Sequence, residues 1–281
     1  MFTSICALVN AYDGILLDAY GVLLDKTGPL PGAVALVERL EREGKPYLIL
    51  TNSASRLPET FAAELAAMGF PVTPARILTS GMLLGPFFRA KILKDARCLV
   101  LGPEESVEYV RRAGGLPAGP LADAQAEAVV IADQRDVTLD VMDRALSLVL
   151  RRLDTGQELS IVLCNPDLIY PVAPGRYGFT AGGLAAMLEA VVRERYPELV
   201  DPVIRLGKPH RPIFEEARRM LAADRLVMVG DQLATDILGA NGFGIDSVLV
   251  RTGLSHNART TSDGAARPTW QLRSLLADAP I

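Results

Sequence analysis

Residues 14–23 read Gly-Ile-Leu-Leu-Asp-Ala-Tyr-Gly-Val-Leu, an apolar run that ends in an aspartate and a glycine turn. Residues 15–17 have the continuous apolar character of a strand that is buried on both faces. Asp18 then stands at the carboxyl end of that strand, where α/β enzymes present a carboxylate for nucleophilic attack. The stretch therefore predicts a parallel α/β fold with a candidate nucleophile at Asp18.

The composition is that of a globular protein with a large core. The chain has 281 residues, 49% of them hydrophobic, and a net charge of −4. This length suits two domains. The sequence contains no run rich in Lys and Arg of the kind that binds nucleic acid. No apolar run approaches the roughly 18 residues that span a bilayer. The three cysteines lack metal spacing, and the apolar start lacks basic residues. We therefore expect a cytoplasmic protein without nucleic-acid or membrane partners.

The first and last parts of the chain both contain continuous apolar runs that predict buried strands. Apolar runs at 47–50, 226–229 and 247–250 predict further buried strands. Helical patterns cover 33–43 and 58–68, and each is followed by a glycine that suits a helix C-cap. Because the strands show no polar alternation, they predict a doubly wound parallel sheet covered on both faces.

The middle of the chain has its own alternation of elements. Strands are expected at 98–101, 128–131 and 160–163, with helices near 104–114 and 138–153. The second of these helices has an apolar face made by residues at helical spacing, Leu139, Met142, Leu146, Val149 and Leu153. We expect an inserted α/β domain at 82–179 and a core formed by residues 1–81 and 180–281.

Four clusters of polar residues have the character of strand ends, namely Asp18, Thr51-Asn52, Lys208 and the pair Asp231 and Asp236. Ligands of open parallel sheets bind outside the carboxyl ends of the strands, so these loops are expected to converge. A carboxylate attacks phosphorus only when a cation, a lysine and further donors neutralise the phosphoryl charge. Mg²⁺ prefers oxygen ligands, which the two late aspartates supply. Lys208 adds a positive charge just before a helix expected to begin near residue 212.

The order of these motifs resembles a known family. Asp-x-x-Gly-Val at 18–22, Thr-Asn at 51–52, Gly-Lys-Pro at 207–209 and Gly-Asp-x-x-x-Thr-Asp at 230–236 look like the motifs of the haloacid dehalogenase-like (HAD) hydrolase superfamily. The long interval between the second and third motifs leaves room for a cap domain. Cys-Asn-Pro-Asp at 164–167, with the glycines Gly175, Gly182 and Gly183, makes the chain similar to class IIA, the NagD-like phosphatases. The resemblance implies a Rossmann-like core with an inserted α/β cap of the C2 type.

The resemblance also implies roles for individual residues. Asp18 would be the nucleophile that forms an aspartyl-phosphate, and Lys208 would bridge this nucleophile and the phosphate. Thr51 and Asn52 would hold the phosphoryl group of a small phosphorylated molecule. The cofactor would be Mg²⁺, with ligands from the side chains of Asp18, Asp231 and Asp236 and from the backbone carbonyl of Tyr20. Asn165 and Asp167 are expected on the substrate side of the cap, or as residues that shape their own loop.

Tyr20 is the departure from the family pattern, which has a second aspartate there as the proton donor. A phenol, whose ordinary pKa is about 10, is a poor replacement for a carboxyl group in this role. Proton donation typically contributes about 10²–10⁴-fold to such reactions, so the replacement predicts weak activity or a restriction to good leaving groups. The alternative role for Tyr20 is that of an aromatic wall that packs toward the cap. Two other functions stay open: a protein that binds phosphate and Mg²⁺ with little turnover, and a 2-haloacid dehalogenase-type hydrolase.

Overall fold

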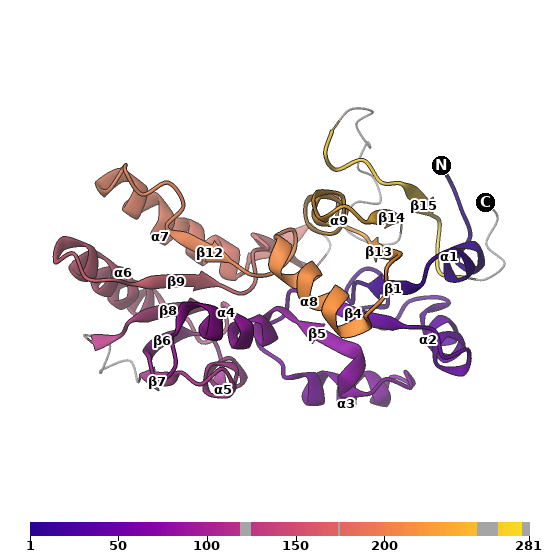
Figure 1. Cartoon of the computed structure of the whole chain (residues 1–281), viewed down its shortest axis with the longest axis horizontal. Coiled ribbons are helices and arrows are strands. Elements are labelled where there is room, and N and C mark those ends of the chain that lie inside the picture. The colour runs from indigo at the N-terminus through magenta and orange to yellow at the C-terminus, as the bar shows by residue number, and fades with distance from the viewer. Residues whose placement is uncertain (119–124, 174, 252–263, 277–281) are drawn as a thin grey trace. The chain divides into compact units, whose positions relative to one another are not determined.

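The computed structural model describes residues 1–118, 125–173, 175–251 and 264–276 of the chain (Figure 1). Contacts between residues divide the chain into two compact units. The first unit comprises Met1–Thr51, Pro58–Leu78 and Lys208–Ile281, and the second comprises Asn52–Leu57 and Thr79–Gly207. Each unit has its own parallel sheet, as the two separate alternations of strands and helices in the sequence predict.

The first unit is built on a six-stranded sheet with the order β15-β14-β13-β1-β4-β5. Its strands are β1 (Gly14–Leu17), β4 (Tyr47–Thr51), β5 (Ile77–Thr79), β13 (Leu226–Gly230), β14 (Asp246–Val250) and β15 (Trp270–Leu272). The central strand β1 pairs in parallel with β13 on one side and with β4 on the other. The carboxyl ends of these three strands, which come from distant parts of the sequence, therefore share one edge of the sheet.

Helices cover both faces of this sheet. They are α1 (Ile5–Ala11), α2 (Ala33–Arg42), α3 (Pro58–Ala67), α8 (Arg211–Leu221) and α9 (Leu238–Phe243). Ile15 and Leu17 of β1 share a core with residues of α1, α2 and α3. Leu16, which points to the opposite face, is completely buried as well, and α8 contacts β4. Burial on both faces explains the continuous apolar strands and confirms the predicted doubly wound α/β sheet.

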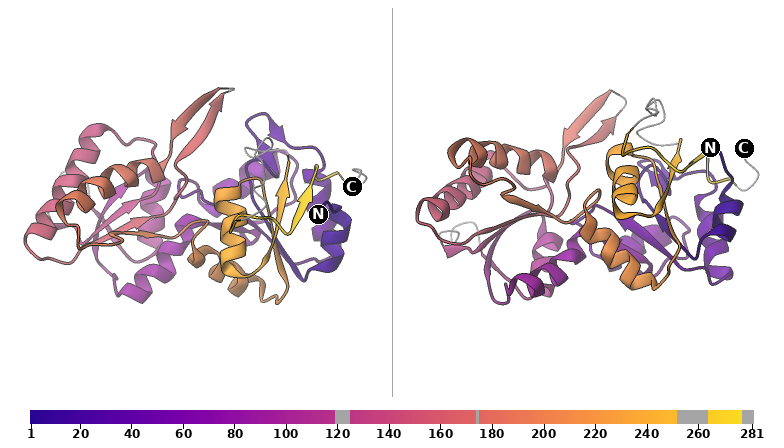
Figure 2. Two further views of the ribbon diagram at one scale, coloured as in Figure 1. Left: turned by 90° about the horizontal axis from the view of Figure 1, so that it is seen from above. Right: turned by 45° about the horizontal axis from the view of Figure 1, so that its top comes forward.

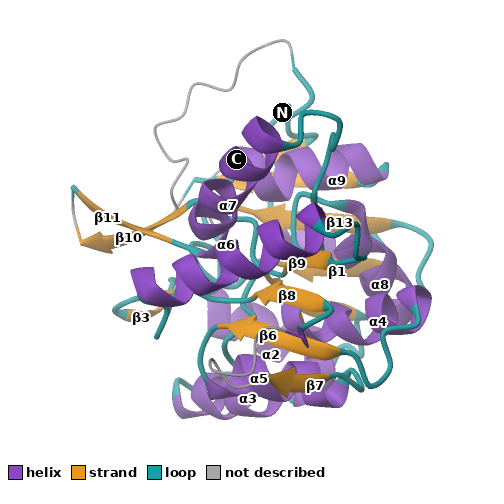
Figure 3. Ribbon diagram, turned by 90° about the vertical axis from the view of Figure 1, so that its left-hand side faces the viewer, coloured by secondary structure: helices purple, strands orange, loops and turns teal. Residues whose placement is uncertain are grey.

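The second unit is built on a five-stranded parallel sheet with the order β12-β9-β8-β6-β7. Its strands are β6 (Arg97–Leu101), β7 (Leu116–Ala118), β8 (Ala128–Ile131), β9 (Ser160–Leu163) and β12 (Val203–Arg205). Figure 3 shows β6, β7, β8 and β9 side by side, with α6 (Leu139–Asp154) and α7 (Ala181–Arg195) packed along them. The strands expected at 98–101, 128–131 and 160–163 are thus confirmed.

The described residues of the second unit also form two more α-helices, a hairpin and the short 3-10 helix η2 (Ser80–Leu83). The helices are α4 (Leu84–Lys91) and α5 (Glu104–Arg112), and α5 contacts β6 and β7. Strands β10 (Ile169–Ala173) and β11 (Arg176–Phe179) pair antiparallel as a separate hairpin. Figure 2 shows this hairpin extending away from the five-stranded sheet.

The boundary between the units differs from the expected inserted domain at 82–179. Strand β12 pairs with β9, which makes it the edge strand of the second sheet. Helix α7 contributes Ala185, Leu188 and Val192 to the core between α6 and this sheet. Because both elements are needed to complete that core, residues 180–207 group with the second unit rather than with the first.

Two further observations concern the described residues as a whole. Among them, no helix is both long and apolar enough to cross a membrane. Cys6, Cys98 and Cys164 are all free thiols, and the latter two are buried. Burial raises the pKa of both buried thiols to about 12, so these side chains stay neutral in the core.

Candidate active site

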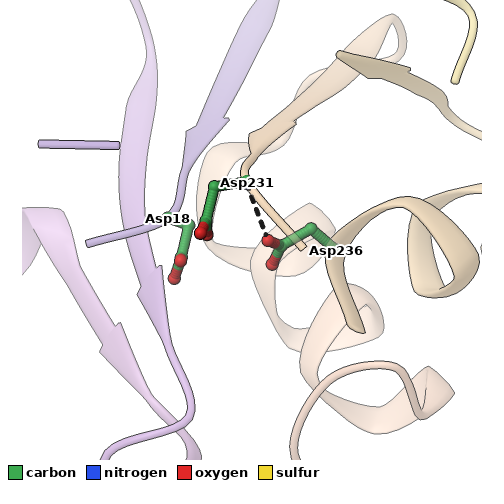
Figure 4. Close-up of side chains that lie close together, drawn as sticks. All are labelled: Asp18, Asp231 and Asp236. Carbon is green, nitrogen blue, oxygen red and sulfur yellow. Dashed lines mark hydrogen bonds between the residues drawn. The ribbon is translucent and has the colours of Figure 1, made fainter. Parts of the chain in front are cut away.

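Three aspartates converge at the carboxyl edge of the first sheet (Figure 4). Asp18 follows β1, Asp231 follows β13, and Asp236 lies in the short helical turn η4 (Leu233–Ile237). Each offers a carboxylate oxygen within 4.8 Å of the others, and all three side chains are buried. The register explains the meeting of the first two, since Leu17 of β1 pairs with Val229 of β13. The convergence expected from the strand-end positions is therefore present.

Lys208 joins this cluster as its only lysine among the described residues. Its Nζ donates to Asp18 Oδ1 at 2.6 Å and to the carbonyl oxygen of Leu50 at 3.1 Å. The same Nζ lies 2.8 Å from Asp236 Oδ1. Lys208 is 2% exposed, so these interactions are made away from solvent. The carbonyl of Leu50 is a partner that sequence reasoning missed, because a backbone acceptor leaves no residue signature.

Asp236 is fixed by the backbone that precedes it. Its Oδ2 accepts hydrogen bonds from the backbone N–H groups of Asp231 and Gln232, each at 3.1 Å. These hydrogen bonds bring the backbone of Gly230 close to the side chain of Asp236. A Cβ on Gly230 would lie only 2.2 Å from Asp236 Cβ. This explains why glycine precedes Asp231 in the motif at 230–236. The side chain is fully buried, so its carboxylate is held in place by backbone donors and by Lys208.

Burial and charge together set the ionisation of this cluster. The pKa of Asp18 is raised to about 7, chiefly because the carboxyl is buried; attraction to Lys208 opposes this shift and repulsion from Asp236 adds to it. Burial alone would lower the pKa of Lys208, but attraction to Asp18 and Asp236 outweighs it and holds this pKa above its ordinary value. When ionised, the three carboxylates outnumber the single ammonium group, so the cluster carries excess negative charge.

The donor set fits Mg²⁺. Carboxylate oxygens are hard ligands, and two or three of them suffice because this ion keeps several of its waters. The excess negative charge of the buried cluster calls for a cation at the same place. Asp18, Asp231 and Asp236 are therefore the residues that can hold Mg²⁺.

Thr51 and Asn52 lie at the end of β4, the strand next to β1. Thr51 is its last residue and Asn52 follows directly, and both are 5% exposed. Asn52 groups with the second unit, where its Nδ2 donates to Asp167 Oδ1 at 3.0 Å. Asn165 Oδ1 in turn accepts from the backbone N–H of Asp167 at 3.0 Å. The structure thus joins Asn165, Asp167 and Asn52 in one network, a connection that the sequence did not reveal.

Ser80 is a further residue that sequence reasoning missed. Its hydroxyl is completely buried and donates to the carbonyl oxygen of Asn52 at 2.7 Å. Ser80 and Asn52 are far apart in sequence, so no local sequence pattern predicts this contact. Ser80 therefore anchors the chain directly after β4.

Tyr20 and Gly21 form the turn after Asp18. The backbone N–H of Gly21 donates to the carbonyl oxygen of Leu24 at 2.8 Å and closes the turn. Gly21 has φ +89°, and a Cβ there would lie 2.4 Å from Asp231 Oδ2. Tyr20 is 41% exposed, so its side chain is not part of the buried carboxylate cluster.

Known proteins show the same fold and similar sequences. The haloacid dehalogenase-like hydrolase family matches residues 15–115, and a second HAD-hydrolase-like family matches residues 205–279. The 5'-nucleotidase YutF of Bacillus subtilis is 30% identical over 95% of this chain and 97% of its own length. The ribonucleotide monophosphatase NagD of Escherichia coli is 27% identical over 91% of this chain and 94% of its own.

A solved structure of a similar protein contains magnesium. This is the glycerol phosphate phosphatase from Mycobacterium tuberculosis, whose crystal structure in complex with magnesium superposes with a TM-score of 0.80 at 26% identity. The match covers 98% of this chain and 78% of that one. Sequence relatives, matching families and fold agree with one another. The chain belongs to the haloacid dehalogenase-like hydrolases, in the NagD group of class IIA.

Proposed function

We propose that this protein is a Mg²⁺-dependent phosphatase that hydrolyses a small phosphorylated metabolite through an aspartyl-phosphate on Asp18. The observation that carries the proposal is the buried cluster of Asp18, Lys208, Asp231 and Asp236 at the carboxyl edge of the first sheet. The three relatives named above, which are nucleotide and glycerol phosphate phosphatases, support this substrate class.

In this proposal, Asp18 attacks the phosphoryl group and the leaving group departs with the bonding electrons. Lys208 holds Asp18 Oδ1 and fixes the direction of the carboxylate, so that the nucleophile is oriented before the substrate binds. Thr51 and Asn52, at the end of the neighbouring strand, bind phosphoryl oxygens. Bound Mg²⁺ supplies positive charge that neutralises the phosphoryl oxygens. Water then hydrolyses the aspartyl-phosphate and returns Asp18 to its carboxylate form.

Tyr20 occupies the place of the family's second aspartate, and we propose that it limits the choice of leaving group. Its backbone carbonyl remains available as a metal ligand, so the substitution spares the metal site and removes the carboxyl that protonates the leaving group. An alkoxide leaving group needs that proton, whereas acyl and aryl groups leave without it. Turnover of alkyl phosphates is therefore expected to be slow.

The test compares leaving groups in the wild type and in Tyr20→Asp. Phosphate release in Mg²⁺ is measured with acetyl phosphate, 4-nitrophenyl phosphate, glycerol 3-phosphate and a nucleoside monophosphate. We expect Tyr20→Asp to raise kcat/KM on the two alkyl phosphates by about 10²-fold or more, with little gain on the other two. Equal gains on all substrates, or none, would contradict the role given to Tyr20.

Controls separate the proposed chemistry from the alternatives. Asp18→Asn removes the nucleophile and is expected to abolish phosphate release from every substrate. Phosphate binding without release from any substrate would support a binding protein instead. Halide release from 2-chloropropionate without added metal would indicate a dehalogenase.

A further inference from the structure

Asn52 is held at two points by residues of the second unit. Its side-chain nitrogen donates to Asp167 Oδ1 at 3.0 Å, and its carbonyl oxygen accepts from the hydroxyl of Ser80 at 2.7 Å. Only 5% of Asn52 is exposed. Both the side chain and the following peptide are therefore fixed, which is more than a surface turn after a strand requires.

The loop that carries Asp167 is itself rigidly built. It follows β9 as Cys164-Asn165-Pro166-Asp167, and the side chain of Asn165 closes a turn on the backbone N–H of Asp167. The backbone N–H of Gly182, in the first turn of α7, donates to the carbonyl oxygen of Asp167 at 3.1 Å. A Cβ on Gly182 would lie 2.4 Å from that oxygen, so only glycine allows this approach. Asp167 is thus held from both sides of its own backbone.

The same loop also packs against the residue before Lys208. A Cβ on Gly207 would lie 2.6 Å from Asn52 Oδ1 and 2.6 Å from the carbonyl oxygen of Cys164. Gly207 therefore lies against both the loop and Asn52. Asn52 is adjacent in sequence to Thr51, and Gly207 is adjacent to Lys208. The loop therefore contacts residues next to Thr51 and Lys208, to which the proposed function assigns phosphate binding.

We propose that Asp167 is a positioning residue for phosphoryl binding, acting through Asn52 rather than by contact with the leaving group. Its carboxylate accepts the hydrogen bond that orients the Asn52 carboxamide, and this holds the peptide after Thr51 in the conformation that receives the phosphoryl group. The role needs a hydrogen-bond acceptor of the right shape and does not need a charge. The inference rests on the proposed function and adds to it the residue that prepares the phosphate site.

The first test compares two substitutions at one position. Asp167→Asn keeps an oxygen that can accept from Asn52 Nδ2, whereas Asp167→Ala removes the acceptor. We expect kcat/KM to fall about tenfold in Asp167→Ala, the size of one well-placed hydrogen bond, and to stay within about threefold of the wild type in Asp167→Asn. Equal losses in both variants would overturn the proposal, because they would mean that the charge itself is required.

The second test uses substrates that differ only in the leaving group. Because the phosphoryl group is common to them, Asp167→Ala should lower kcat/KM by the same factor with acetyl phosphate and with 4-nitrophenyl phosphate. A factor that differs by tenfold between the two substrates would instead place Asp167 against the leaving group. In a double-mutant cycle, Asn52→Ala and Asp167→Ala should be no worse together than Asn52→Ala alone.

A matched control distinguishes positioning from loss of stability. Glu189 is a buried carboxylate of α7 in the second unit, paired with Arg193 and Arg205. Glu189→Gln should lower the melting temperature without changing kcat/KM by more than about twofold. If Glu189→Gln lowers kcat/KM as much as Asp167→Ala does, the effect is one of folding and the proposal fails.

Inorganic phosphate separates this inference from the proposed function. Its affinity is measured by calorimetry with Mg²⁺ present, which requires no turnover. Weaker phosphate binding in Asp167→Ala, restored in Asp167→Asn, would support the positioning role even if no substrate were hydrolysed. Unchanged phosphate affinity in Asp167→Ala would overturn the positioning role while leaving a phosphatase activity intact.

Discussion

The backbone of Gly21 lies against the carboxylate of Asp231, so close that a residue with a Cβ atom at position 21 would displace this carboxylate. An added Cβ would lie 2.4 Å from Asp231 Oδ2, inside any allowed contact distance. Gly21 also has φ +89°, a backbone conformation that residues other than glycine rarely adopt. The turn after the nucleophile and the carboxylate opposite it are therefore coupled.

Gly21→Ala is expected to weaken Mg²⁺ binding by about tenfold or more, because Asp231 must move away. The matched control is Gly69→Ala, since Gly69 has φ +91° with open space around the added Cβ. In this control the free energy of unfolding should fall by about 1–2 kcal/mol, the cost of the left-handed conformation for a residue with a Cβ. Its metal affinity should not change. Calorimetric titration with Mg²⁺ gives both affinities. Equal metal affinity in the two variants would contradict the role of the contact with Asp231.

Residue identities at the strand ends were predictable, but their partners were not. Asp18 and Asp231 follow neighbouring strands that the parallel sheet brings together, whereas Lys208 follows a strand of the second sheet and Asp236 lies in the turn η4. The structure places all four within hydrogen-bonding or metal-binding distance. The bond from Asn52 to Asp167 spans 115 positions of sequence and depends on where the loop after β9 lies. No local pattern encodes such a distance, so the sequence left Asp167 with two alternative roles.

At the scale of elements, helix α6 shows how far an apolar pattern predicts burial. Met142 and Val149 of the expected apolar face are buried in the core of the second unit. Leu139, the first residue of the helix, is 67% exposed although it shares the same spacing. Leu148 was not part of the expected face, yet it is completely buried. The helical period predicted an amphipathic helix, and packing against α7 and the sheet selected which residues are covered.

Two substitutions in α6 check this distribution. Leu148→Ala is expected to destabilise the protein by about 2–5 kcal/mol, because it leaves a cavity in a closely packed core. Leu139→Ala, an identical change in the same helix, should stay within about 0.5 kcal/mol of the wild type. Denaturant unfolding monitored by circular dichroism gives both values. A similar cost at the two positions would mean that Leu139 is covered in solution.

At the scale of the whole molecule, the raised pKa of Asp18 links folding stability to pH and metal. The pKa of this carboxyl is 3.8 in the unfolded chain and about 7 in the folded, metal-free protein. Between these values the folded state holds the proton more tightly than the unfolded state does. Raising the pH through this window therefore lowers the stability of the metal-free protein, and the contribution is constant above it.

Mg²⁺ should accordingly stabilise the protein more at pH 8 than at pH 5, because at low pH it competes with the proton on Asp18. Melting temperatures measured at several pH values, with Mg²⁺ and with a chelator, give the metal-dependent shift. Asp18→Asn is the control, since its metal-free form lacks this ionisation and should lose less stability between pH 5 and pH 8. A metal-dependent shift that is the same at both pH values in the wild type would contradict the linkage.

The sequence by itself determined the fold class, the central strands of both sheets and the family to which the protein belongs, while edge strands such as β5, β12 and β15 were not predicted. The features that it determined follow from local causes, namely continuous apolar runs, helical periods and motifs at strand ends. Tertiary structure alone decided that β12 and α7 complete the second sheet, that Ser80 and Asp167 hold Asn52, and that Gly21 must lie against Asp231. The physical reason is that hydrogen bonding between distant strands and close approach of backbones depend on how elements pack, which no single stretch of sequence contains.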